Sequence, residues 1–216
     1  MPTFLQLQGQ YCRFIGENDA SSIDAVGKAL INDALKDISS RFAFECNKKT
    51  DTLTISSGVA DLASNFDYSH IDRIKVYRYD GTTKYEYSPV PLDNFSAYSS
   101  SECVYAIDFE NAQLKLPDDV TVSMDYYSVP ADLSADGSIT NFPVPQAISR
   151  QAAGQYWESI EEEEDHAKLN FAIADSLTQQ AVARNMELKA YRPFTAYGGR
   201  NLGYTKKGGS KTGYRR

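Results

Sequence analysis

The stretch best equipped for chemistry is YWESIEEEEDHAKL, where six acidic residues occur within eight positions and His166 follows them directly. Carboxylates beside an imidazole could hold a metal ion. Successive helical residues point in different directions, however, so four consecutive glutamates cannot converge on one ion. Glu162 and His166 share a face at four-residue spacing, but no matching second pair occurs elsewhere. We therefore interpret the stretch as a solvated helix face or a corner between helices, and we predict no metal site.

The stretch DLSADGSITNFP resembles part of a calcium-binding loop. Asp132, Ser134, Asp136 and Gly137 match the first, third, fifth and sixth positions of the EF-hand pattern. The twelfth position needs a bidentate glutamate but is Pro143. A strand also precedes the stretch, where the EF-hand has a helix. A turn at Asp136-Gly137 explains the same residues, so we predict no calcium site.

No other motif commits the chain to catalysis. GGSKTG near the C-terminus lacks the glycine that a phosphate loop requires before its lysine, because Ser210 stands there. The two histidines, His70 and His166, lie outside nucleophile and zinc motifs. We expect no catalytic residue, no cofactor and no metal. A hydrolase that uses an acidic pair is kept as a remote alternative.

The elements around these residues change character along the chain. Apolar residues recur every three or four positions from Ile23 to Phe42, which predicts a helix from about residue 22 to 43. Alternating, tyrosine-rich segments then predict five or six antiparallel strands over residues 50–130, with hairpin turns at Asp80-Gly81 and Glu110-Asn111.

A proline-bearing linker separates these strands from a second helical region. Two apolar stripes, nearly in phase, follow the linker, and Pro193 ends the region. The pattern fits either one helix of about 45 residues or two helices broken near residues 161–166.

We accordingly predict an α+β protein: a helical bundle with an inserted small antiparallel β domain and a flexible C-terminal tail. The expected parts are an N-terminal segment and helix (1–49), the β domain (50–130), a linker (131–145), the C-terminal helical region that packs with residues 22–43 (146–192), and a basic extended tail (193–216).

The basic and acidic residues are distributed unevenly along the chain. The last 21 residues hold six of the 22 basic residues and none of the 29 acidic ones, so residues 1–195 carry a net charge of −13. Six glycines make this tail too flexible to fold alone, and its tyrosines offer aromatic anchors. The composition favours a segment that becomes ordered on an acidic partner. A solubilising or nucleic-acid-binding tail would have the same composition.

The bulk composition suits an ordinary globular protein with a sizeable core. The chain has 216 residues, of which 42% are hydrophobic and 24% are charged. No apolar run is long enough to cross a membrane, and we see no secretion signal. Three scattered cysteines favour free thiols in a reducing compartment.

The order of these parts resembles the head-to-tail adaptor (connector) proteins of tailed bacteriophages, including the gatekeeper or tubular proteins of short-tailed phages. The resemblance rests on AVGKALINDALKDISSRFAFECNKKTDTLTI, HIDRIKVYR, LKLPDDVTVSMDYYSVPADL and VPQAISRQAAGQYWESIEEEEDHAKLNFAIADSLTQQAV, and it covers most of residues 22–190. It lies in elements and spacings, since no invariant motif is involved.

The resemblance implies a structural virion protein, not an enzyme, that is assembled in the host cytoplasm. It would form a homo-oligomeric, usually dodecameric, ring between the portal and a tail or nozzle protein. Double-stranded DNA would pass without sequence recognition, and no membrane would be involved. The C-terminal tail would grip the portal through Tyr197, Arg200, Tyr204, Lys206, Lys207, Lys211, Tyr214, Arg215 and Arg216.

Subunits would pack through the helical stripes, for which we select Ile160, Phe171 and Leu177. The alternative from another class is a β-rich component of a phage tail that binds carbohydrate or protein with the tyrosines of residues 68–127.

Overall fold

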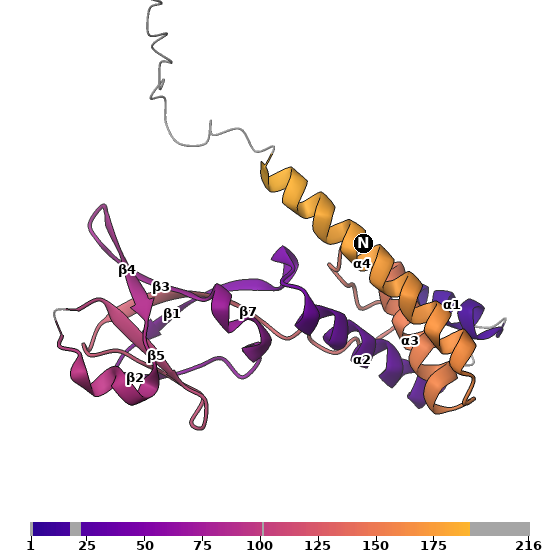
Figure 1. Ribbon diagram of the computed structural model, residues 1–216, viewed down its shortest axis with the longest axis horizontal. Helices are drawn as coiled ribbons and strands as arrows, with labels where there is room; N and C mark the ends of the chain where they lie inside the picture. Colours follow the sequence, from indigo (N-terminus) through magenta and orange to yellow (C-terminus); the bar gives the residue numbers. More distant parts are fainter. Residues whose placement is uncertain (1, 18–22, 101, 191–216) are drawn as a thin grey trace, which may run out of the picture. The chain divides into compact units, whose positions relative to one another are not determined.

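The computed structural model describes residues 2–17, 23–100 and 102–190 (Figure 1). Within these residues, four α-helices pack around one hydrophobic core, and seven strands enclose a second.

The first helix, α1 (Phe4–Ile15), was not expected from the sequence. Thr3 caps it, because the Gln6 backbone N–H donates to Thr3 Oγ1 while the Thr3 N–H donates to Gln6 Oε1. Gly16, with a φ of 86°, ends the helix in the left-handed region. The buried face carries Phe4, Leu7, Gln8, Tyr11, Cys12 and Ile15.

The second helix, α2 (Ala25–Arg41), occupies most of the predicted 22–43 segment. Asp24 is its cap, since the Gly27 N–H donates to Asp24 Oδ1 at 2.8 Å. The C-terminal helical region is two helices, α3 (Pro145–Ser159) and α4 (Glu164–Ala190). The break between them includes Glu162, whose φ of 55° is incompatible with a continuous helix.

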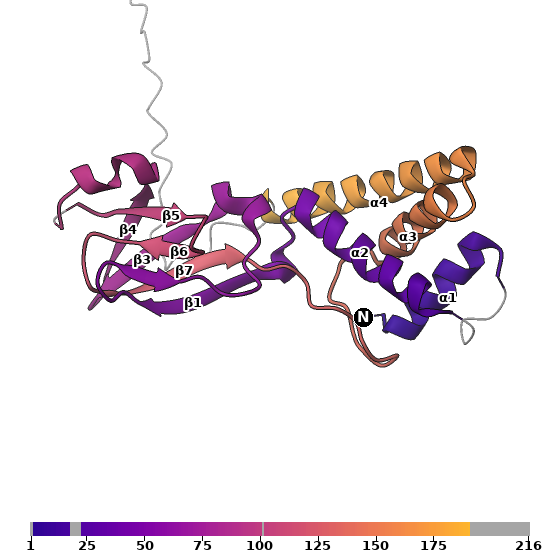
Figure 2. The same cartoon turned by 90° about the horizontal axis from the view of Figure 1, so that it is seen from below.

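The helical core forms where α1 and α2 both pack against α3 (Figure 2). Its fully buried members include Leu7, Ile31, Ile38 and Ile148. The helix α4 adds Phe171, whose ring lies directly over Gly154 of α3. Glycine at this position allows the aromatic ring to approach the α3 backbone closely.

The strands form one mixed sheet, in the order β1-β7-β3-β4-β5-β6-β2 (Figure 2). All neighbouring strands are antiparallel except β4 and β5, which pair in parallel through two residues each. The strands are β1 (Lys48–Thr54), β2 (Val59–Asp61), β3 (Lys75–Asp80), β4 (Thr83–Pro89), β5 (Val104–Asp108), β6 (Gln113–Lys115) and β7 (Thr121–Tyr127). In the described residues, the short 3₁₀ helix η2 (Glu45–Asn47) leads from α2 into β1, while η3 (Tyr68–Arg73) lies between β2 and β3 and η4 (Leu92–Ala97) between β4 and β5.

The sheet nearly closes on itself, because its two edge strands, β1 and β2, are joined by one tight turn. Ser56 and Val59 exchange backbone hydrogen bonds of 3.0 and 3.2 Å across this turn. Ser57 and Gly58 between them both have positive φ, as the turn of a two-residue hairpin requires. The result is a seven-stranded mixed barrel with its own core, built around residues such as Val76, Leu114, Val122 and Met124.

The predicted fold class is therefore wrong. The structure is not a helical bundle with a small inserted antiparallel β domain, but a nearly closed seven-strand mixed barrel accompanied by a few helices. Local alternation correctly indicates the hairpins β3–β4 and β5–β6. The parallel β4–β5 pairing and the closing turn depend on contacts that no local pattern reveals.

The contact between Gly154 and Phe171 gives a first prediction. A Cβ at residue 154 would lie 2.5 Å from two Phe171 ring atoms. We expect Gly154→Ala to destabilise the fold by about 1–3 kcal/mol, as overpacking typically does. Thermal unfolding measures this. Gly137→Ala is the matched control, because nothing lies within 4 Å of its Cβ position. Equal melting temperatures for the two variants would show that α4 does not pack tightly on α3.

Candidate interaction surfaces

The acidic segment around His166 makes local bonds. His166 Nδ1 lies 2.6 Å from Glu163 Oε2, and its ring stacks on Trp157 with 4.9 Å between centroids. Glu162 lies in the break before α4, so the four-residue spacing to His166 does not place the two side chains on one helix face. Within the described residues, no three His, Cys, Asp or Glu side chains are grouped so that they could hold a metal ion.

The loop that resembles a calcium site instead ties the linker to two helices. Asp132 Oδ1 lies 2.7 Å from Lys36 Nζ on α2, and Asp136 Oδ1 accepts a hydrogen bond from Gln8 Nε2 on α1. The Asp136 backbone carbonyl also accepts from the Leu5 N–H. Two of the candidate ligands are thus used in contacts with the helices.

The other histidine, His70, is buried between η3 and α2. Its Nε2 lies 2.8 Å from the Ser39 backbone oxygen. A carbonyl oxygen only accepts, so Nε2 carries the proton and donates it. The ring also packs edge-on against Tyr127 of β7. His70 therefore connects the barrel to the helical core.

A second link in this region comes from Asn32 of α2. Its Oδ1 accepts from the Leu133 N–H at 2.8 Å, and its Nδ2 donates to the Leu133 carbonyl at 3.3 Å. Farther along the chain, the Asn47 carbonyl accepts from both the N–H and the hydroxyl of Ser128. We call these bonds, together with His70–Ser39, the joint.

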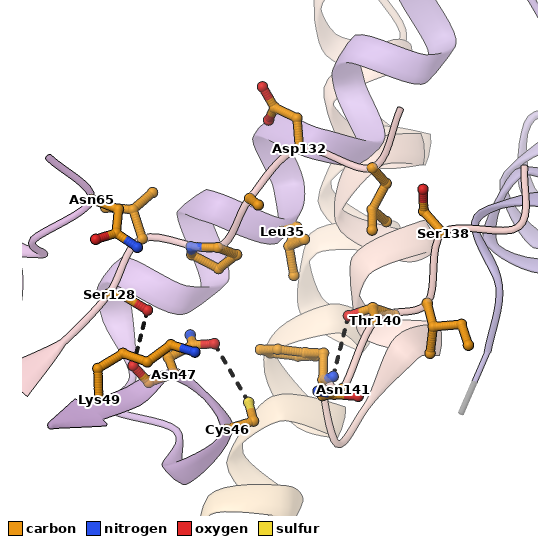
Figure 3. A pocket seen from close by; sticks show the side chains of 16 residues that line it. Leu35, Cys46, Asn47, Lys49, Asn65, Ser128, Asp132, Ser138, Thr140 and Asn141 are labelled. Atoms are coloured by element: carbon orange, nitrogen blue, oxygen red, sulfur yellow. Dashed lines mark hydrogen bonds between the residues drawn. The ribbon is translucent and has the colours of Figure 1, made fainter. Parts of the chain in front are cut away.

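One pocket lies beside the joint and has a volume of about 480 Å³ (Figure 3). Several of its polar side chains are hydrogen-bonded to neighbours, as the dashed lines at Asn47, Ser128 and Thr140 show. Burial raises the pKa of the Cys46 thiol, which disfavours a reactive thiolate there. These hydrogen-bonded side chains fit a structural contact region between the two cores better than a reaction site.

Another pocket, of about 400 Å³, opens on the helical core. We call it the acid-rimmed pocket. Residues from α1, α2 and the end of α3 line it, and each is apolar, aromatic, glycine or acidic: Tyr11, Ile15, Glu17, Ile23, Asp24, Val26, Gly27, Tyr156 and Ile160.

Burial and acidic neighbours raise the pKa of two tyrosines at this pocket. The Tyr156 hydroxyl donates to Glu161 Oε1 at 2.7 Å, and this bond, with burial and nearby carboxylates, raises the pKa of Tyr156 to about 12. Burial first, then Tyr156, Asp24 and other groups, raises the pKa of Tyr11 well above its usual value. The carboxylates of Asp24 and Glu17 contribute to both shifts.

The predicted contact residues occupy different environments. Ile160 follows α3, is 47% exposed and lines the acid-rimmed pocket. Phe171 and Leu177 are half-buried within the chain's own helical packing. Their participation in contacts between copies stays a prediction. The proposed portal-docking residues from Tyr197 to Arg216 lie outside the described residues.

The acid-rimmed pocket was missed at the sequence level because α1 was missed. A signal existed: Thr3 and Gln6 form a capping-box pattern, and Phe4, Leu7, Tyr11 and Ile15 follow at helical spacing. Even so, the pocket unites three helices that are distant in sequence, and single-segment patterns do not show how they meet.

The described helices include none that is both long and apolar enough to span a membrane.

The structure combines a nearly closed barrel with packed helices, and the polar residues described above form bonds between structural elements. The chain belongs to the SU10 adaptor protein family, whose sequence model matches residues 2–196. Membership makes it a structural component of the bacteriophage particle, an adaptor consistent with the head-to-tail connection, and points to a non-enzymatic role. No curated protein matches the chain.

The joint supplies a second prediction. Asn32→Ala leaves the Leu133 N–H and carbonyl without their partners, and unmet buried polar groups cost about 1–3 kcal/mol of stability. Chemical denaturation measures the loss. The control is Lys36→Ala, one turn away, whose exposed ion pair with Asp132 should contribute about 0–1 kcal/mol. A loss for Asn32→Ala no greater than that for Lys36→Ala would contradict this role.

Proposed function

We propose that this adaptor forms a homo-oligomeric ring, with twelve copies as in the usual dodecamer, between the portal and a tail or nozzle protein. The ring lets double-stranded DNA pass without sequence recognition and seats the tail. Assembly takes place in the host cytoplasm, and the ring then remains in the virion. The family match over residues 2–196 is the observation that carries this proposal.

The charge of the chain supports a passage for DNA. Residues 1–195 hold 16 basic and 29 acidic residues. A negatively charged wall repels DNA phosphates, so DNA would not adhere to it during transit. A protein that binds DNA generally would instead present a basic face.

The C-terminal segment is proposed to dock on the portal. Exposed ion pairs contribute only about 0–1 kcal/mol each, so its positive charges alone would bind weakly. Aromatic residues are common anchors at protein interfaces. Tyr204 and Tyr214, buried in portal pockets, would therefore supply more of the affinity than Lys206 and Lys207.

The alternative, a tail component that binds carbohydrate or protein through the barrel tyrosines, has less support. Four of the tyrosines at issue, Tyr87, Tyr105, Tyr126 and Tyr127, are buried. Of the others, Tyr68 lies beside Phe109, while Tyr77 and Tyr79 of β3 contact each other. Ring assembly would favour the adaptor role, whereas specific glycan binding would favour the alternative.

Two substitutions test whether the helical surface makes contacts between copies. Leu177→Asp places a charge against the helical core and should lower stability by at least about 2 kcal/mol. Ile160→Lys changes an exposed side chain, so its melting temperature should be nearly unchanged while ring assembly on the portal falls. Circular dichroism and negative-stain imaging report the two effects. Normal rings from Ile160→Lys would remove this residue from the interface.

Deletion of residues 197–216 tests the proposed portal contact. We expect a folded protein with an almost unchanged melting temperature that no longer co-sediments with portal rings. Replacing Tyr204 and Tyr214 with alanine should weaken docking more than replacing Lys206 and Lys207. Binding at two salt concentrations separates the two contributions, since charge contacts weaken with salt. Full binding by the truncated protein would refute portal docking by the tail.

A further inference from the structure

The acid-rimmed pocket has the features of an unfilled docking site. Val26 and Ile160 line it and are 50% and 47% exposed, so apolar surface stays open to solvent. Among the described residues that line it, the charged ones are Glu17 and Asp24, both acidic, and Glu161 is bonded to the Tyr156 wall. An occupant that matches this surface carries an apolar side chain next to a positive charge.

We propose that the pocket binds residues 191–195 of a second copy of the chain, with the Phe194 ring on the apolar floor and the Arg192 guanidinium at the acidic rim. This inference rests on the proposed ring, because it supplies a contact between adjacent copies. It concerns residues other than those proposed to dock on the portal.

The sequence of that segment, Tyr-Arg-Pro-Phe-Thr, fits the chemistry of the pocket. It contains two aromatic residues, one arginine and no acid. Proline restricts the backbone around position 193 and favours an extended conformation before it, which lowers the entropy lost on docking. The volume of about 400 Å³ is adequate for one aromatic side chain.

The occupant comes from another copy because of the length of α4. This helix begins four residues after Ile160, at Glu164, and contains 27 residues. A helix of that length extends about 40 Å. The four residues from Ala190 to Phe194 span at most about 14 Å, so we assign the segment to another copy.

A binding experiment tests the pocket directly. The probe is a fluorescent peptide of residues 190–195, titrated by anisotropy against the full chain carrying Phe194→Ser, which leaves the pocket free. We expect saturable binding that weakens with added salt. A peptide with serine in place of Phe194 should bind at least about tenfold more weakly.

Variants of the full chain show where the peptide binds. Adding Ile160→Lys to the Phe194→Ser chain should reduce affinity at least about tenfold, because it removes apolar surface and lowers the local negative charge. Adding Leu169→Lys is the matched control: Leu169 is also exposed, at 56%, but lies outside the pocket, so binding should not change. Absence of saturable binding, or equal binding to both double variants, would overturn the proposal.

Photo-crosslinking tests whether the contact joins two copies. A photoreactive phenylalanine derivative at position 194 is introduced into a mixture of isotopically heavy and light full chains that are assembled on portal rings. Mass spectrometry should find heavy–light links to residues 11–27 or 156–161. Links confined to one copy, or located only elsewhere, would refute the contact.

Failure of this inference is distinct from failure of the proposed function. Rings that assemble on the portal while the peptide does not bind would leave the adaptor role intact and remove this contact. Specific peptide binding and heavy–light links in a protein that forms some assembly other than a ring would support the pocket and refute the ring.

Discussion

The buried hydrogen bond from His70 to the Ser39 carbonyl holds together the two parts on which everything else depends. The barrel and the helices each have their own hydrophobic core, so apolar burial alone does not fix one against the other. Directional bonds do, since each requires a particular distance and angle. Asn32 of α2 adds two bonds to Leu133, which follows the barrel in the chain, while the bonds from Ser128 to the Asn47 carbonyl extend the pairing of β1 with β7. Polar side chains near the linker are therefore used for alignment.

Elements whose stabilising contacts are local could be predicted from sequence. The helix α2 follows from its apolar spacing, and β3–β4 follows from alternation on either side of the Asp80-Gly81 turn. Barrel closure could not be predicted, because it requires β1 and β2 to become the two edges of one sheet. The break after α3 was only one of two options, since the apolar stripes continue through it and the positive φ of Glu162 leaves no mark on periodicity.

The candidate surfaces also divide into features that local sequence reveals and features that depend on distant contacts. Ile160 could be selected from a helical stripe, but whether it faces a neighbour in its own chain or solvent depends on how α1, α2 and α3 meet. The run of acidic residues was evident in the sequence, but the partner of each carboxylate depends on where the chain places it. Glu161 bonds to Tyr156, and Glu163 bonds to His166. Sequence reasoning therefore identified the family, whereas its contact residues stay predictions and the pocket was missed.

The tight turn from Ser56 to Val59 affects how the protein behaves when many copies lie close together. A sheet with open margins presents unpaired backbone N–H and C=O groups that can recruit strands from other molecules. Here β1 and β2, the two marginal strands, are drawn together at that turn, and both are already paired along their other sides. The proposed ring would bring many identical chains to one location and concentrate every exposed strand. A nearly sealed sheet lets such chains meet at high local density while reducing the chance that they polymerise through their backbones.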